Sequence, residues 1–220
     1  MTRVCSCLTA IALTLFILAQ AKPVQAHPHV FVDAKIGLVV SEDRRLEAIR
    51  IVWLFDAFHT LYILSFDGIT PTAEGGLTQA AKAQLSKSYT DWQRGFDGFA
   101  KLLIGGELIK LDIPSNVEAS LVAGQLEVSF TRALPNPISL RDAAAQIAVY
   151  DETYYHAVTV AEPPDFQGDA LKCKSTLIPF NPDAQDRDVQ ETLSKLNRDE
   201  MSAVDGIGAS FADRITFSCA

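Results

Sequence analysis

Residues 30–55 read VFVDAKIGLVVSEDRRLEAIRIVWLF, which is two alternating apolar runs on either side of a polar turn. In the first run, the apolar side chains of residues 30–36 fall on every second position, as they do in a half-buried β-strand. The second run repeats this alternation at residues 49–53, after the polar turn at residues 41–44. The stretch therefore predicts a long antiparallel hairpin near the start of the folded domain.

Three more pairs of apolar runs alternate in the same way and predict three more hairpins. The pairs are residues 99–104 with 108–113, residues 118–122 with 126–131, and residues 145–150 with 155–160. The first of these pairs is joined by Gly105-Gly106, and glycine supplies the positive φ that a two-residue hairpin turn requires.

Two stretches interrupt the hairpins and predict helices. Residues 77–95 have no internal glycine or proline and are rich in alanine, glutamine and lysine. Residues 184–196 place apolar side chains at helical spacing, and Asp183 before them is a suitable N-cap. With a closing strand at residues 215–219, we expect an α+β fold, a single domain of antiparallel β hairpins with inserted helices that spans residues 27–220.

The first 26 residues have the three parts of an export signal. Arg3 makes the start basic, residues 8–19 form an apolar run, and Val24 and Ala26 occupy the −3 and −1 positions of a cleavage site. The apolar run is shorter than the roughly 20 residues that a membrane span needs. We expect a signal peptide, residues 1–26, to be cleaved, which would leave a periplasmic domain without stable membrane insertion. An uncleaved anchor is the alternative.

The charge balance excludes some partners. The chain has a formal net charge of −8, and loss of Arg3 and Lys22 with the signal would make it −10. Such an acidic protein is a poor partner for nucleic acid or anionic lipid, so we expect no nucleic acid to bind. A solvated acidic surface explains the charge as well as any attraction of cations does.

Two cysteines remain after the signal, Cys173 and Cys219. In an exported protein an even pair of cysteines is typical of a disulfide, because the compartment is oxidising. We expect these two residues to be bonded. A metal site that uses their thiolates is the alternative.

His27 and His29 are two of the four histidines in the chain, and they would be the first and third residues after cleavage. The α-amine of His27 and its ring nitrogen would then chelate one metal ion together. A square copper or nickel site that uses backbone amides is blocked, because Pro28 has no amide proton to lose. The chelate therefore needs side chains from elsewhere in the fold, and His59 and His156 are the candidates. A flexible, solvated chain end is the alternative.

Each of these two candidates lies near a carboxylate in the sequence. Asp56 and His59 are three residues apart, which suits either two metal ligands or an N-cap at the start of a short helix. Asp151 and His156 belong to a tyrosine-rich cluster, where Asp151 also fits a tight turn beside packed side chains. The predicted ligands of a zinc, nickel, cobalt or copper ion are therefore His27, His29, His59, His156, Asp56 and Asp151.

Common catalytic motifs are missing from the sequence. It has no Gly-x-Ser-x-Gly, no His-Glu-x-x-His, no phosphate-binding glycine loop and no dinucleotide fingerprint. The stretch that begins at Asp67 resembles a calcium-binding loop in sequence. Its third position is Ile69 and its twelfth is Thr78, so it lacks the oxygen ligands that calcium requires at these positions. We expect no enzymatic activity and no catalytic residues, since catalysis would have to depend on a bound metal.

Several short motifs occur in a particular order along the chain. Residues 27–34 read HPHVFVDA directly after the signal, residues 53–56 read WLFD, residues 150–155 read YDETYY, and a cysteine pair closes the chain. In this order they resemble a family of uncharacterised bacterial exported proteins, described as the periplasmic component of an uncharacterised ABC-type transport system. The resemblance implies a domain of unknown function in the periplasm. Many members have an acidic residue where this chain has Ala57.

Proteins of that family often stand beside nickel and cobalt permease-type transporters, which implies a role in handling transition metals. The first hypothesis is therefore a periplasmic metal-binding accessory protein whose partner is an inner-membrane metal transporter. The second is a copper redox enzyme that uses an N-terminal histidine chelate. The third is a periplasmic interaction module that binds no metal, in which the histidines are incidental.

Overall fold

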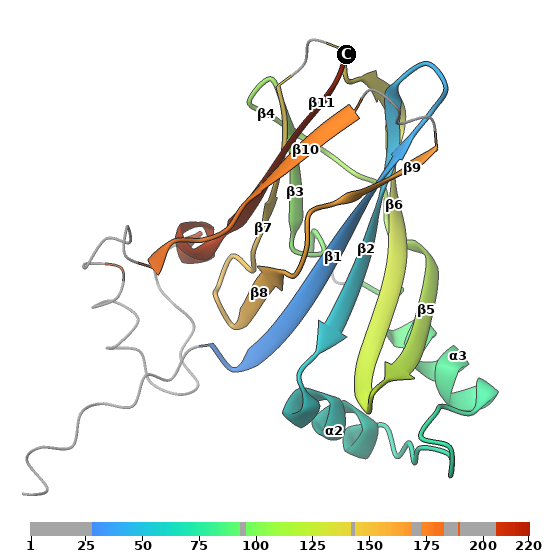
Figure 1. Cartoon of the computed structure of the whole chain (residues 1–220). Helices are drawn as coiled ribbons and strands as arrows, with labels where there is room; N and C mark the ends of the chain where they lie inside the picture. The colour runs from blue at the N-terminus through green and yellow to red at the C-terminus, as the bar shows by residue number, and fades with distance from the viewer. Residues whose placement is uncertain (1–27, 93–95, 142–143, 169–172, 183–188, 190–205) are drawn as a thin grey trace, which may run out of the picture.

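The computed structural model describes residues 28–92, 96–141, 144–168, 173–182, 189 and 206–220. Two β-sheets carry most of this part of the chain (Figure 1). The first sheet has the order β5-β6-β2-β1-β8, with β9 also paired to β1. Its strands are β1 (Val30–Val40), β2 (Arg45–Phe55), β5 (Ser115–Val122), β6 (Gln125–Ser139), β8 (His156–Val160) and β9 (Asp165–Gly168).

The second sheet has the order β10-β11-β7-β3-β4, and all its pairs are antiparallel. Its strands are β3 (Ala100–Ile104), β4 (Glu107–Ile109), β7 (Ala145–Val149), β10 (Cys173–Ile178) and β11 (Asp213–Cys219). Together with the helices described below, this arrangement is an α+β domain, as the sequence predicts.

Buried and exposed side chains alternate along the first strand of the first sheet. Along β1 the side chains of Val30, Val32, Ala34 and Ile36 are buried while those between them are exposed, so the predicted inward face of this strand is confirmed. The neighbouring β2 pairs with β1 in antiparallel register, with Ala34 opposite Trp53.

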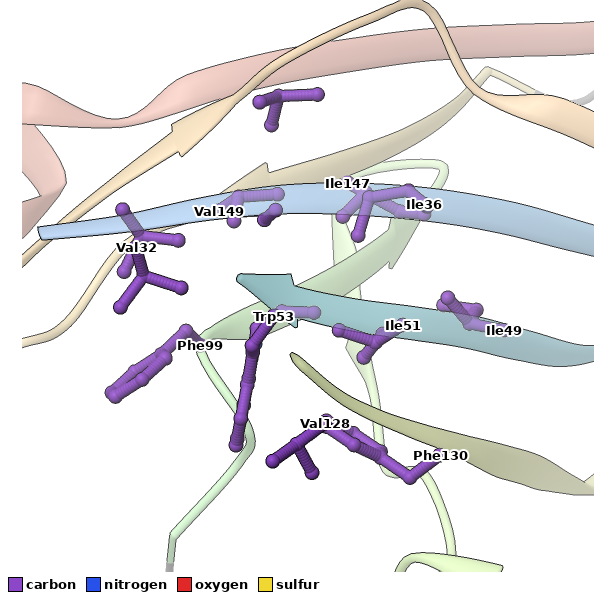
Figure 2. Packing of buried hydrophobic residues seen from close by; sticks show 14 of the residues in the cluster. Val32, Ile36, Ile49, Ile51, Trp53, Phe99, Val128, Phe130, Ile147 and Val149 are labelled. Carbon is purple, nitrogen blue, oxygen red and sulfur yellow. The ribbon is translucent and has the colours of Figure 1, made fainter. Parts of the chain in front are cut away.

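The core lies between the two sheets. Figure 2 shows Val32 and Ile36 of β1 in one cluster with Trp53 of β2 and with Ile147 and Val149 of β7. Each of these five side chains is no more than 2% exposed. Because β7 belongs to the second sheet, the two sheets bury their apolar faces against each other and form one hydrophobic core.

Two helices follow β2 at one end of the first sheet (Figure 1). Helix α2 (Ala57–Phe66) begins at Asp56, whose side chain accepts from the backbone N–H of His59. Helix α3 (Gln79–Ser88) begins at Thr78, which caps it in the same way. α3 lies within the predicted helix of residues 77–95 but ends at Ser88.

The early end of α3 has a packing reason. Beyond it, Trp92 stacks on Trp53 of β2 with ring centroids 6.2 Å apart, so the chain leaves the helix axis to bury this ring. Residues 93–95 at the end of the predicted helix lie outside the described residues. The second predicted helix, residues 184–196 with Asp183 as its N-cap, also lies outside them except for Val189.

Three of the four predicted hairpins are confirmed: β1–β2, β3–β4 and β5–β6 are antiparallel pairs. The fourth prediction is wrong, because β7 and β8 belong to different sheets. β8 runs parallel to β1, with His156 opposite Val30. The turn before β8 is held by Asp151, which accepts from the backbone N–H groups of Thr153 and His156 and directs the chain away from β7.

The predicted disulfide is present between Cys173 of β10 and Cys219 of β11, 46 residues apart in sequence. The two residues are directly opposite each other in the antiparallel pair of strands. β11 contains the predicted closing strand of residues 215–219. No helix within the described ranges is long and apolar enough to cross a membrane.

Candidate functional site

The first residues of β1 lie between the start of α2 and the start of β8. The backbone N–H of Phe31 donates to Asp56 Oδ2 at 2.9 Å, and the N–H of Asp56 donates to the carbonyl of Phe31 at 3.0 Å. On the other side, the N–H of His29 donates to the carbonyl of Tyr155 at 2.9 Å. The chain therefore enters the fold at a point where α2 and β8 both begin.

Asp56 is an acceptor for backbone groups on two elements. Its Oδ1 accepts from the N–H of His59 at 2.8 Å, while Oδ2 accepts from Phe31. Partial burial acts to raise the pKa of Asp56, but the N–H groups of Phe31, His59 and Phe58 outweigh it, and the net shift is downward. The carboxylate is thus ionised at neutral pH, and its visible role is to join the start of β1 to the start of α2.

Asp151 holds His156. One carboxylate oxygen, Oδ2, lies 2.7 Å from His156 Nδ1 and also accepts from the backbone N–H of His156 at 3.0 Å. The other oxygen accepts from the N–H of Thr153 at 3.0 Å. Burial acts to raise the pKa of Asp151, yet the bonds from the His156 ring and from the two N–H groups prevail and lower it to about 2.

An ionised carboxylate can only accept, so Nδ1 of His156 carries a proton. In the neutral imidazole this leaves Nε2 with its lone pair available. A metal-binding histidine has this arrangement in most proteins, because a second carboxylate or carbonyl fixes the tautomer and the ring orientation.

The ring of His59 lies beside that of His156, with centroids 6.4 Å apart and planes at 81°. Two imidazoles that bind one ion at about 2.1 Å have ring centres roughly 5–6 Å apart. Burial and the neighbouring His156 lower the pKa of His59, while Asp56 acts in the opposite direction. The shift keeps His59 neutral, which is the form that binds a metal.

Aromatic rings surround the histidine pair. Phe55 lies 5.1 Å from the His59 ring, and Phe99 and Tyr155 lie 4.8 and 5.2 Å from the His156 ring, measured between centroids. Sequence reasoning did not identify Phe99. Its backbone has φ of +60°, and its N–H donates to Asp97 Oδ1 at 3.0 Å, so the turn at residues 97–99 was the available signal.

The structure brings the predicted residues together to different degrees. His59, His156 and Asp151 are close neighbours, and Asp56 lies at the first turn of α2. His29 packs against Tyr155 at 4.8 Å between centroids, and that ring in turn contacts His156.

Further ligands would be needed to hold an ion. His27 lies outside the described residues. Within the described ranges, no three histidine, cysteine, aspartate or glutamate side chains form a group that could hold a metal ion. The two imidazoles would supply only part of a four-ligand site such as that of zinc.

Comparisons with known proteins give a family and name no activity. A family model described as "Protein of unknown function (DUF1007)" matches residues 12–219. An uncharacterized protein of Haemophilus influenzae is 26% identical over 204 residues, which cover 89% of this chain and 92% of that protein.

Proposed function

The chain belongs to the DUF1007 family of proteins of unknown function, and we propose that it is a periplasmic, transition-metal-binding accessory protein that serves an inner-membrane metal transporter. The observation that supports this function is the His59–His156 pair, in which Asp151 fixes one ring, at the point where β1 begins. The ion would be zinc, nickel, cobalt or copper, the ions that imidazole ligands suit.

The missing ligands would come from the mature N-terminus. His27 is two residues before His29, whose N–H is bonded to Tyr155, the residue next to His156. We propose that the α-amine and ring of His27 bind at the histidine pair, since two residues of extended chain can span about 7 Å. The set would then be four nitrogen donors, completed by cleavage after Ala26.

The surroundings favour binding over catalysis. Both nearby carboxylates are occupied as acceptors, Asp56 by two backbone N–H groups and Asp151 by the His156 ring and backbone groups. Neither carboxylate is therefore left to act directly as a general base, and the proposal uses the available Nε2 of His156 as a metal ligand. We therefore propose a carrier and no enzyme.

Calorimetry tests the proposal on protein that begins at His27. We expect one zinc, nickel, cobalt or copper(II) ion to bind, with at least a tenfold loss of affinity in His156→Ala and a similar loss when one glycine precedes His27. Affinity should also fall as the pH drops below about 8, because the α-amine and then the imidazoles must lose their protons to bind.

Glu162→Gln is the matched control, since this exposed carboxylate pairs with Lys35 away from the histidines and should leave the affinity unchanged. If His27-starting protein bound all four ions no better than a His59→Ala/His156→Ala variant, the proposed function would be wrong.

A further inference from the structure

Helix α2 presents an unusual surface. Residues 57–66 read AFHTLYILSF and contain no acidic residue, lysine or arginine. Thr60 and Leu64 are its buried residues, and Thr60 Oγ1 accepts from the N–H of Leu126 to fix the helix on β6. The large apolar side chains exposed on the helix are Phe58 (80%), Leu61 (63%), Tyr62 (56%) and Phe66 (76%).

These four side chains share one face. Positions i, i+3, i+4 and i+8 lie on the same side of an α-helix, and the buried residues are on the opposite side. A surface helix normally turns charged or polar residues to water on this side. Most of the surface of these four side chains is therefore left in water, and exposed apolar clusters of this kind mark interaction sites.

We propose that this face of α2 docks into an apolar groove with a cationic rim on a partner protein. The partner is the metal transporter of the proposed function, so the inference rests on that function and assigns the surface through which it acts. The mode is helix-in-groove binding, in which side chains at i, i+3, i+4 and i+8 are the anchors.

The charge pattern selects a protein partner with basic residues. Residues 51–81 contain no lysine or arginine, and three acids lie among them: Asp56 and Asp67 at the two ends of α2, and Glu74 beyond. A helix that lies on a membrane carries basic residues that attract anionic headgroups, and α2 has the opposite pattern.

A second copy of the chain fits less well. It would bring two acidic molecules together, and an antiparallel pair of α2 helices would place Asp56 of each against Asp67 of the other. A groove with lysine or arginine at its rim satisfies both acids while its floor covers the aromatic side chains.

The docking face is continuous with the histidine pair. His59 contacts Phe55 on one side and Tyr62 on the other, with ring centroids 5.1 and 6.1 Å apart, and Tyr62 contacts Phe66 at 6.1 Å. A row of rings thus leads from the core, past His59, to the exposed face. A partner seated on α2 would cover the edge of the site, so an ion could pass between the proteins without release into solution.

Photo-crosslinking in cells tests the surface. A photoreactive phenylalanine analogue replaces Phe58 or Phe66, and Leu108 on β4 of the other sheet, 68% exposed, is the matched control. We expect a covalent product with a multi-spanning transport protein from the two α2 positions and none from Leu108. Asp67→Lys should reduce the crosslinking yield at Phe66 at least fivefold, because it places a cation against the cationic rim of the groove. The substitution should leave the helix intact, since a cation is favourable at a helix C-terminus.

Other outcomes overturn the inference. In the crosslinking experiment these are a product with the mass of two copies, equal yields at Leu108, or no product at all. In a separate experiment the purified protein is mixed with phosphatidylethanolamine/phosphatidylglycerol vesicles. Flotation with the vesicles that is lost in Phe58→Ser/Phe66→Ser would also overturn the inference.

The same double variant separates this inference from the proposed function. Its calorimetric affinity for the metal should match that of the unaltered protein. If the unaltered protein binds metal but the photoreactive variants give no crosslink, only the docking face is refuted. If the photoreactive variants give the crosslink but the unaltered protein binds no metal, only the metal function is refuted.

Discussion

Asp151 is the residue on which the geometry of the histidine pair most depends. It accepts from the ring and the backbone of His156 and from both the N–H and the hydroxyl of Thr153. These bonds set the direction of β8 as well as the orientation of one imidazole. Asp56 also bonds to backbone groups on two elements, but among the described residues it makes no such bond to a ring.

Asp151→Asn should destabilise the protein by about 2–3 kcal/mol at pH 7, as estimated from a pKa of about 2 in the folded protein and about 3.9 unfolded. Because the folded pKa is depressed, the contribution is fully present above about pH 4 and is lost as the pH falls through about 2. Urea unfolding of both proteins between pH 7 and pH 2.5 measures this. A difference in free energy of unfolding that stayed constant over this range would contradict the assignment.

At the scale of single elements, Asp56 connects the first strand to the first helix. Asp56→Ala removes the N-cap of α2 and also the acceptor for Phe31 on β1. Loss of an N-cap costs about 1 kcal/mol and loss of a further hydrogen bond costs about the same, so we expect about 2 kcal/mol in all. Amide hydrogen exchange should show faster exchange at both Phe31 and His59.

Thr78→Ala is the matched control for this variant, because the Thr78 side chain caps α3 and, in the described part of the chain, bonds only within its own helix start. It should cost about 1 kcal/mol and leave the exchange of Phe31 unchanged. Equal costs for the two variants, with Phe31 still protected in Asp56→Ala, would show that the link between β1 and α2 contributes nothing.

The strands were the most predictable elements. Alternation identified β1 and β2 with their inward faces, because the predicted inward side chains of both strands are buried. Alternation does not say which neighbour a strand pairs with, and so β8 was assigned to β7 and not to β1. Helix α2 has apolar residues on all sides and therefore gave no helical period, although Asp56 suggested its start.

The candidate site was predictable in its residue types more than in its geometry. The spacing of Asp56 and His59 suited either two metal ligands or an N-cap, and the structure contains the cap. The approach of His59 to His156 joins positions far apart in the sequence, and it depends on the parallel pairing of β8 with β1. No local pattern encodes such a contact, so the scarcity of histidine was the only guide.

At the scale of the whole molecule, the two sheets depend on each other. Ile147 on β7 is fully buried, and its neighbours in the cluster include residues of β1 and β2 from the other sheet (Figure 2). The disulfide joins β10 to β11 within the second sheet, so it does not connect the two layers. Apolar packing therefore holds the sheets together across the core, together with a buried hydrogen bond from the N–H of Val160 on β8 to Asp213 Oδ2 on β11.

If the shared core makes the domain one cooperative unit, a destabilising substitution in one sheet must lower the unfolding midpoint of both sheets. Ile147→Ala should lower the free energy of unfolding by about 2–5 kcal/mol, whereas Ile178→Ala on β10, 48% exposed in the same sheet, should change it by less than about 0.5 kcal/mol. The fluorescence of Trp53 on β2 and of Trp92, which stacks on it, reports on the first sheet, and far-UV circular dichroism reports on both sheets. In urea the two signals of Ile147→Ala should move together to a lower midpoint, because Trp53 loses its packed surroundings only when the core opens. A fluorescence midpoint that stayed in place while the dichroism midpoint fell would mean that the sheets unfold separately.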